Sequence, residues 1–177
     1  MYQTTQPPPP PGSAPDYRVH FDDIGAGEFW PRVRGSGWII QSVDWGGQDY
    51  TSRPFDAASA TSFSGVTITV TNRGAAASGV VRQKGAVVIV FPAEQSMWSN
   101  FGFSPSRIKT AMPDDEGRFA IEQLAAGDYF VIAVPREDQY TWLEPGYFAR
   151  AWAFATRLTL GWGERKDVSL SIARVPR

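Results

Sequence analysis

The stretch FAIEQLAAGDY at 119–129 decides the fold, because a closely related stretch, VHFDDIGAGEF, stands at 19–29. Five positions match at a constant offset of 100 residues: Ile24/Leu124, Ala26/Ala126, Gly27/Gly127, Glu28/Asp128 and Phe29/Tyr129. A second match follows in each copy, between GVTITV at 65–70 and DVSLSI at 167–172. The pattern indicates two related units in tandem.

Runs of strand length follow one another from Tyr17 onward. VTITVT at 66–71 alternates apolar residues with Thr, which is typical of a half-buried strand. AVVIVF at 86–91 and YFVIAV at 129–134 are continuously apolar and predict central, doubly covered strands. Further strands are predicted at 38–43, 118–121, 156–160 and 168–172. These short strands predict an all-β sandwich.

Two connections have a recognisable chemistry. PDDEG at 113–117 combines Pro, Asp and Gly and predicts a hairpin turn. PGYFARAWAF at 145–154 is the one stretch that predicts a short helix, opened by Pro145.

Composition narrows the function classes. The 177 residues have a net charge of −1, so no global field recruits nucleic acid, and no apolar stretch is long enough for a membrane span. There is no Cys, which excludes disulfides and thiolate metal sites. The N-terminus does not resemble a signal peptide, so we expect a non-secreted protein or a mature or truncated piece of a longer one.

Residues 1–16 form a Pro-rich leader. Its run of prolines favours an extended polyproline II rod. We expect either a linker or a contact segment, and the candidate contact residues are Pro7, Pro8, Pro9, Pro10 and Pro11.

From residue 76 onward the chain resembles the carboxypeptidase regulatory-like module. A small-Gly-Val opening strand, a D-x-G-x-F hairpin and a Leu-x-x-Gly-x-Tyr corner are that family's pattern. The matching residues are Asp115, Gly117, Phe119, Leu124, Gly127 and Tyr129. The resemblance implies a transthyretin-like, immunoglobulin-like sandwich of about seven strands. It also implies a place at the end of longer bacterial cell-surface proteins, many of them acidobacterial, and says little about function.

The first unit departs from this pattern. We predict three parts: the leader at 1–16, a partial unit at 17–75 that lacks about three opening strands, and a complete sandwich at 76–177. A half-sandwich exposes an apolar face and open strand edges. Three explanations stay open: a truncated chain, packing of the first unit on the second, or completion by strands of another subunit.

No residue set predicts catalysis, a cofactor or a metal site. His20 is the only histidine, so a multi-His zinc site is impossible and a Ser-His-Asp triad would depend on it. The acidic clusters Asp22–Asp23 and Asp114–Glu116 could supply oxygen ligands to Ca²⁺, but turn chemistry explains them as well. We therefore predict that the protein is not an enzyme.

Aromatic residues are the remaining candidates for binding. Trp98 and Phe101 lie in one loop, Tyr140 and Trp142 lie in a second, and Trp30 lies in the first unit. These rings could cap the sandwich, contact another protein or stack on sugar.

The prediction is therefore a non-catalytic, extracellular or cell-surface structural module that assembles with protein partners. The partner is another copy or the rest of a longer polypeptide, and the assembly is a surface polymer or filament completed by strand exchange. A carbohydrate-binding accessory module is the alternative, and we expect no nucleic acid and no membrane insertion.

Overall fold

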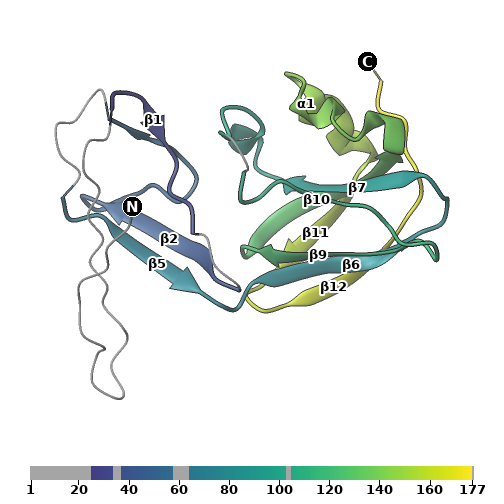
Figure 1. Cartoon of the computed structure of the whole chain (residues 1–177), viewed down its shortest axis with the longest axis horizontal. Coiled ribbons are helices and arrows are strands. Elements are labelled where there is room, and N and C mark those ends of the chain that lie inside the picture. The colour runs from purple at the N-terminus through teal and green to yellow at the C-terminus, as the bar shows by residue number, and fades with distance from the viewer. Residues whose placement is uncertain (1–24, 34–36, 58–63, 103–104, 177) are drawn as a thin grey trace.

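The computed structural model describes residues 25–33, 37–57, 64–102 and 105–176 (Figure 1). Within these ranges the chain consists mostly of β-strands, which confirms the predicted all-β class. The prolines 7–11, His20 and Asp22–Asp23 lie outside the described residues.

Seven strands build the C-terminal part, in two sheets. One sheet has the order β11-β10-β7-β8 and the other the order β12-β6-β9. The strands are β6 (Ala75–Val81), β7 (Ala86–Pro92), β8 (Lys109–Ala111), β9 (Arg118–Leu124), β10 (Gly127–Pro135), β11 (Thr156–Leu160) and β12 (Arg165–Leu170). All pairs are antiparallel except β12 with β6, which is parallel.

The two sheets face each other across one apolar core (Figure 1). Inward side chains such as Val90, Phe119, Val131 and Leu160 come from both sheets and are buried. The continuously apolar runs form β7 and β10, which lie at the centre of their sheet as predicted. This is a sandwich, because each strand contributes alternate residues to the shared core.

A second apolar layer covers the outer face of β7 and β10. Ile89, Phe91 and Ile132 point outward there and contact Phe148 and its neighbours from a short helix. That helix is α1 (Tyr147–Ala151), which lies within the predicted stretch 145–154. Four 3-10 helices accompany it: η1 (Gln95–Trp98), η2 (Arg136–Asp138), η3 (Thr141–Leu143) and η4 (Trp152–Phe154). The outer layer explains why β7 is apolar on both faces.

The turn at 113–117 forms, but not as a hairpin. The Gly117 amide donates to the Asp114 carbonyl (2.9 Å), and the Asp114 amide donates to the Arg118 carbonyl (2.9 Å). The flanking strands, however, belong to different sheets, since β8 pairs with β7 and β9 pairs with β6. The hairpin prediction was wrong because the connection passes from one sheet to the other.

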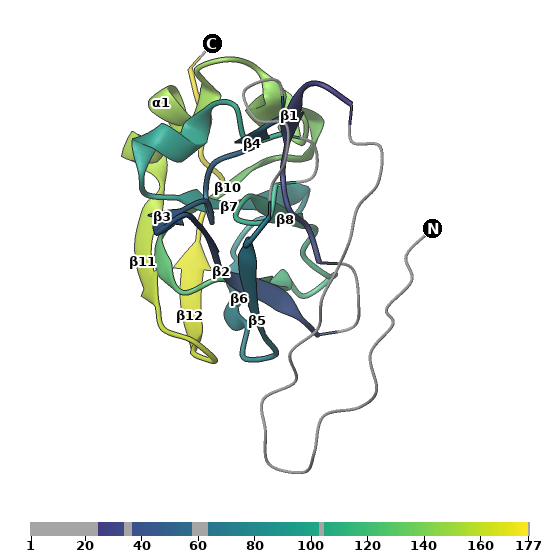
Figure 2. The same cartoon turned by 90° about the vertical axis from the view of Figure 1, so that its left-hand side faces the viewer.

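The described residues of the N-terminal part contain five short strands. They are β1 (Glu28–Phe29), β2 (Ile39–Trp45), β3 (Gln48–Asp49), β4 (Phe55–Asp56) and β5 (Thr67–Thr71). β1 pairs with β4, and β2 lies between β3 and β5. Figures 1 and 2 both show the β1–β4 pair above the β2–β5 sheet.

The sequence repeat recurs in the strand pairing. In the first copy Phe29 pairs with Phe55, and in the second copy Tyr129 pairs with Leu158. β1 and β4 therefore correspond to β10 and β11, and the sequence match makes β5 the counterpart of β12.

The first copy differs in the neighbour of its last strand. β12 pairs in parallel with β6, whereas β5 pairs antiparallel with β2. β2 comes from the segment between β1 and β4, so a strand inserted within the unit lies where the second unit has its opening strand. The boundary between 17–75 and 76–177 stays a prediction.

Candidate functional site

The predicted aromatic residues of the C-terminal part divide into packed and exposed rings. Trp98 donates its indole N–H to the Pro92 carbonyl (2.7 Å), and its ring meets the Phe91 ring edge-on at 6.0 Å between centroids. The ring centroids of Phe101 and Trp142 lie 5.9 Å apart, and both side chains pack against the outer apolar layer. Tyr140, by contrast, is 69% exposed. Three of these four rings thus cap the sandwich, and Tyr140 alone is presented to solvent.

Trp30 joins the N-terminal strands to the sandwich. The Arg32 guanidinium carbon lies 5.3 Å from the centroid of its ring, and a Cβ built at Gly102 would lie 2.7 Å from its Cδ1. Two hydrogen bonds accompany this contact. Asn100 Nδ2 donates to Glu28 (3.3 Å), and Arg32 Nη2 donates to the Phe101 carbonyl (3.4 Å). Residues 28–32 therefore pack on the 100–102 loop of the same chain, and the three explanations for the missing opening strands of the first unit stay predictions.

One face of the β2–β5 sheet is apolar. The register pairs Ile40 with Val70 and Val43 with Ile68, so these four side chains lie on one face, while Thr67 and Thr69 point to the other. Val43 is buried, but Ile68 is 43% and Val70 41% exposed.

Trp38 extends this surface. It lies directly before the first residue of β2, and it is 47% exposed. We call Trp38, Ile68 and Val70 the N-terminal apolar face. The counterparts of Ile68 and Val70 in the second copy are covered, since Leu170 is buried and Ile172 is packed against the core.

A pocket of about 200 Å³ lies where the N-terminal strands meet the sandwich. Its described lining contains Arg32, Arg53 and Arg107 and no Asp or Glu. The arginines come from three separate segments of the chain, so no sequence motif could identify this site. Trp30 and Phe101, two of the predicted binding residues, also line it.

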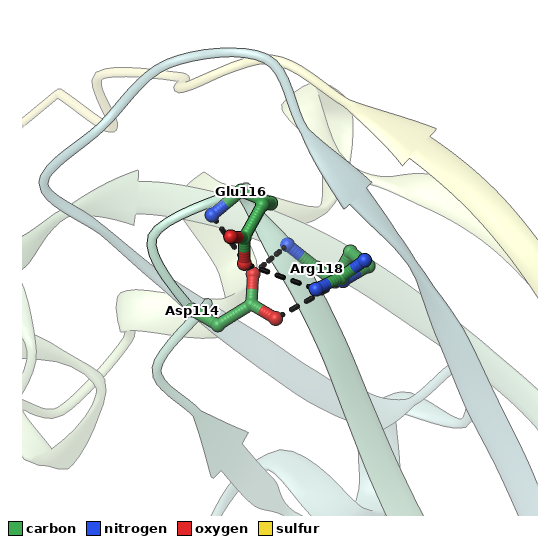
Figure 3. A network of polar contacts seen from close by, with 3 residues as sticks. All are labelled: Asp114, Glu116 and Arg118. Carbon is green, nitrogen blue, oxygen red and sulfur yellow. Dashed lines mark hydrogen bonds and ion pairs between the residues drawn. The ribbon is translucent and has the colours of Figure 1, made fainter.

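The acidic side chains Asp114 and Glu116 of the 113–117 turn interact with groups of the same turn and of Arg118 (Figure 3). Asp114 accepts hydrogen bonds from the amides of Glu116 (3.1 Å) and Arg118 (2.8 Å), and Arg118 forms ion pairs with both carboxylates. The hydrogen bond from the Arg118 amide is the main reason that the pKa of Asp114 is lowered. Within the described ranges, no three His, Cys, Asp or Glu residues gather as a metal site would require.

The described residues also contain no helix long and apolar enough to cross a membrane.

No protein-family model matches this chain, and no curated protein matches it. Among solved structures, the chain is similar to the crystal structure of GBS52, the minor pilin in the Gram-positive pathogen Streptococcus agalactiae. The TM-score is 0.32 at 12% sequence identity, over 63% of this chain and 54% of the pilin chain. The match thus spans about half of that pilin's length, and a likeness at this level supports no functional conclusion.

Proposed function

We propose that this chain is a non-catalytic structural module that assembles with a second copy of itself through the N-terminal apolar face. One observation is central: Trp38, Ile68 and Val70 are each more than two-fifths exposed, whereas Leu170 and Ile172, the counterparts of Ile68 and Val70 in the second copy, are buried or packed against the core. Clustered exposed apolar side chains on a sheet face are typical of interaction surfaces.

The open edges of the same sheet support this proposal. Among the residues that the structure describes, the sheet ends at β3 and β5, and β5 has one neighbouring strand where a central strand has two. An unpaired edge presents backbone N–H and C=O groups that a strand from another copy can bind. Antiparallel pairing of two β5 edges would also place the two apolar faces side by side on one larger sheet.

A cell-surface location and membership of the carboxypeptidase regulatory-like family belong to the same proposal. Two local features support the family: Leu124 is fully buried, and the Tyr129 hydroxyl donates to the Ala125 carbonyl (2.8 Å), as a corner between two strands requires.

Sedimentation of the whole chain over a range of concentrations tests the assembly. We expect dimers or larger species to increase with concentration, and the double variant Ile68→Ser/Val70→Ser to remain monomeric with an unchanged melting temperature. The matched control is Thr67→Ser/Thr69→Ser on the opposite face of β5, which we expect to associate like the parent chain. A parent chain that stays monomeric at every concentration would contradict the proposal, as would a double variant that still associates.

A further inference from the structure

The pocket between the N-terminal strands and the sandwich has walls that are joined within the chain. The walls come from four segments: 30–32, 51–54, 92–101 and 105–108. A Cβ built at Gly102 would lie 2.7 Å from Trp30 Cδ1, and Arg32 Nη2 donates to the Phe101 carbonyl (3.4 Å). These contacts hold the two sides against each other, so the folded chain itself shapes the pocket.

The apolar part of the lining consists of flat rings. Trp30 and Phe101 line the pocket, and both are half-buried. The Phe101 ring is supported from behind by Trp142, at 5.9 Å between centroids. Three prolines line the pocket as well: Pro54, Pro92 and Pro105. A surface lined by aromatic rings is the kind on which proline-rich segments dock in polyproline II conformation.

The polar part of the lining is rich in hydrogen-bond donors. Hydroxyl and amide groups are contributed by Thr51, Ser52, Ser96, Ser99, Asn100 and Ser106, and the described lining contains no Asp or Glu. A run of prolines presents carbonyl acceptors and no backbone N–H, so it needs donors from its binding site. This match does not depend on unpaired charge, since Arg53 already donates to Gln48 (3.0 Å) and interacts with Asp49.

The chain itself carries a segment of the required chemistry. The prolines 7–11 form an uninterrupted run, which lies outside the described residues. Such a run favours the polyproline II conformation before it binds, so little conformational entropy is lost on docking. The pocket volume of about 200 Å³ suits a short stretch of the run rather than the whole leader.

The length of chain between the run and the pocket favours the chain's own leader over that of a second copy. Residues 12–24 separate the run from Gly25, the first described residue. A segment of that length reaches up to about 45 Å when extended. A ligand tethered in this way has an effective concentration on the order of millimolar, which exceeds that of a second copy in dilute solution.

We infer that this pocket binds a proline-rich segment in polyproline II conformation, and that its occupant is the run Pro7–Pro11 of the same chain. This inference does not depend on the proposed assembly, because the pocket and the N-terminal apolar face have no residue in common.

NMR of the whole ¹⁵N-labelled chain tests the occupant, with the Trp30 indole N–H as the reporter and the Trp30→Phe variant to identify its signal. We expect the five substitutions Pro7→Ser to Pro11→Ser, together called the serine variant, to shift this signal, because the ring loses its contact with the run. Pro15→Ser is the matched control in the same leader and should leave the signal in place. An unshifted signal in the serine variant would overturn the inference.

Dilution distinguishes the chain's own leader from that of a second copy. The measurement uses the Ile68→Ser/Val70→Ser background, in which the proposed assembly is absent. We expect the Trp30 signal to be independent of protein concentration there, as an intramolecular contact requires. A signal that moves toward the position of the serine variant on dilution would assign the pocket to the leader of a second copy and overturn the assignment to the same chain.

A peptide of residues 3–13, QTTQPPPPPGS, tests the pocket directly. Added to the serine variant, it should return the Trp30 signal to its parental position in a saturable way. It should bind the parent chain at least about tenfold more weakly, because the tethered leader competes. Absence of saturable binding would overturn the inference, as would equally tight binding of a peptide with serines in place of the prolines.

Phe101→Leu in the serine variant should weaken peptide binding about threefold or more, since it removes an aromatic ring from the wall. Phe154→Leu is the matched control, because Phe154 is 49% exposed and does not line the pocket. Thermal unfolding shows whether both variants are folded at the temperature of the titration. Equal weakening by the two substitutions would overturn the inference.

Discussion

Gly27–Phe29 and Gly127–Tyr129 are the same motif in two environments. Both glycines have φ values that only glycine adopts without strain, +143° and +148°. Both aromatic residues pair with an apolar partner on a neighbouring strand, Phe55 and Leu158 respectively. Yet Tyr129 is fully buried and Phe29 is 40% exposed.

The difference comes from what lies on the other side of the strand. β10 is nine residues long and pairs with β7 from Tyr129 onward. This neighbouring strand completes the burial of Tyr129. β1 ends after Phe29, since Trp30 packs against Gly102 and Pro31 has no N–H for a further ladder bond. A local motif therefore determines backbone conformation and pairing, while the surrounding strands determine burial.

Removing the two aromatic rings gives the largest contrast. We expect Tyr129→Ala to lower the free energy of unfolding by about 3–5 kcal/mol, because a fully buried ring leaves a cavity. Phe29→Ala should lower it by less than about 1 kcal/mol, because that ring is already partly in water. Urea unfolding followed by circular dichroism measures both values. Similar losses in the two variants would show that Phe29 is covered after all.

The last strands of the two copies, β12 and β5, give the next contrast. Leu170→Ala on β12 should lower the free energy of unfolding by about 2–5 kcal/mol, because Leu170 is 5% exposed within the core. Ile68→Ala, at the corresponding position of β5, should stay within about 1 kcal/mol. Thermal and urea unfolding of the two variants at a concentration where the chain is monomeric make this comparison. A large loss for Ile68→Ala under those conditions would mean that β5 is covered within one chain.

Substitutions of Gly27 and Gly127 test whether glycine is equally required at the two positions. Alanine at either position should cost about 1–3 kcal/mol of backbone strain. Gly127→Ala should cost more than Gly27→Ala, because its Cβ would lie 2.4 Å from Arg107 Nη2, which is hydrogen-bonded to the Ala126 carbonyl. At Gly27 the nearest contact among the described residues is Phe29 Cε2 at 4.0 Å.

The double variant Arg107→Met/Gly127→Ala identifies the cause of that difference. If the guanidinium is responsible, the extra cost of Gly127→Ala should disappear once Arg107 is absent. A difference that persists in the Arg107→Met background would instead point to the backbone of β10.

Much of the sandwich could be predicted from the sequence. Continuous apolar runs identify β7 and β10, and the short alternating run TRLTL corresponds in full to β11. Hydrophobic periodicity predicts these strands because a strand buried on one face alternates apolar and polar residues, whereas a strand buried on both faces is apolar throughout.

Sheet membership and the pocket could not be predicted in this way. The turn at 113–117 has hairpin chemistry, yet its flanking strands join different sheets, because β8 is only three residues long and pairs with β7. Arg32, Arg53 and Arg107 are brought together only by tertiary contacts. The packing of Trp98 and Trp142 likewise depends on α1, whose position above β7 leaves no local signal.

Asp128, at the start of β10, gives the smallest expected effect in the comparison of the two copies. The pKa of its carboxyl is lowered, mainly by the hydrogen bond from Thr159 and to a lesser degree by that from Arg157. A carboxyl whose pKa is lowered by folding stabilises the protein above its unfolded value of about 3.9, and this contribution is lost as the pH falls through the folded pKa. We expect an NMR titration of Asp128 to have its midpoint below the ordinary value, and Thr159→Val to move it upward. Thr69→Val, the same change on β5, is the matched control and should leave that midpoint in place. An Asp128 midpoint unaffected by Thr159→Val would mean that this hydrogen bond does not hold the carboxylate.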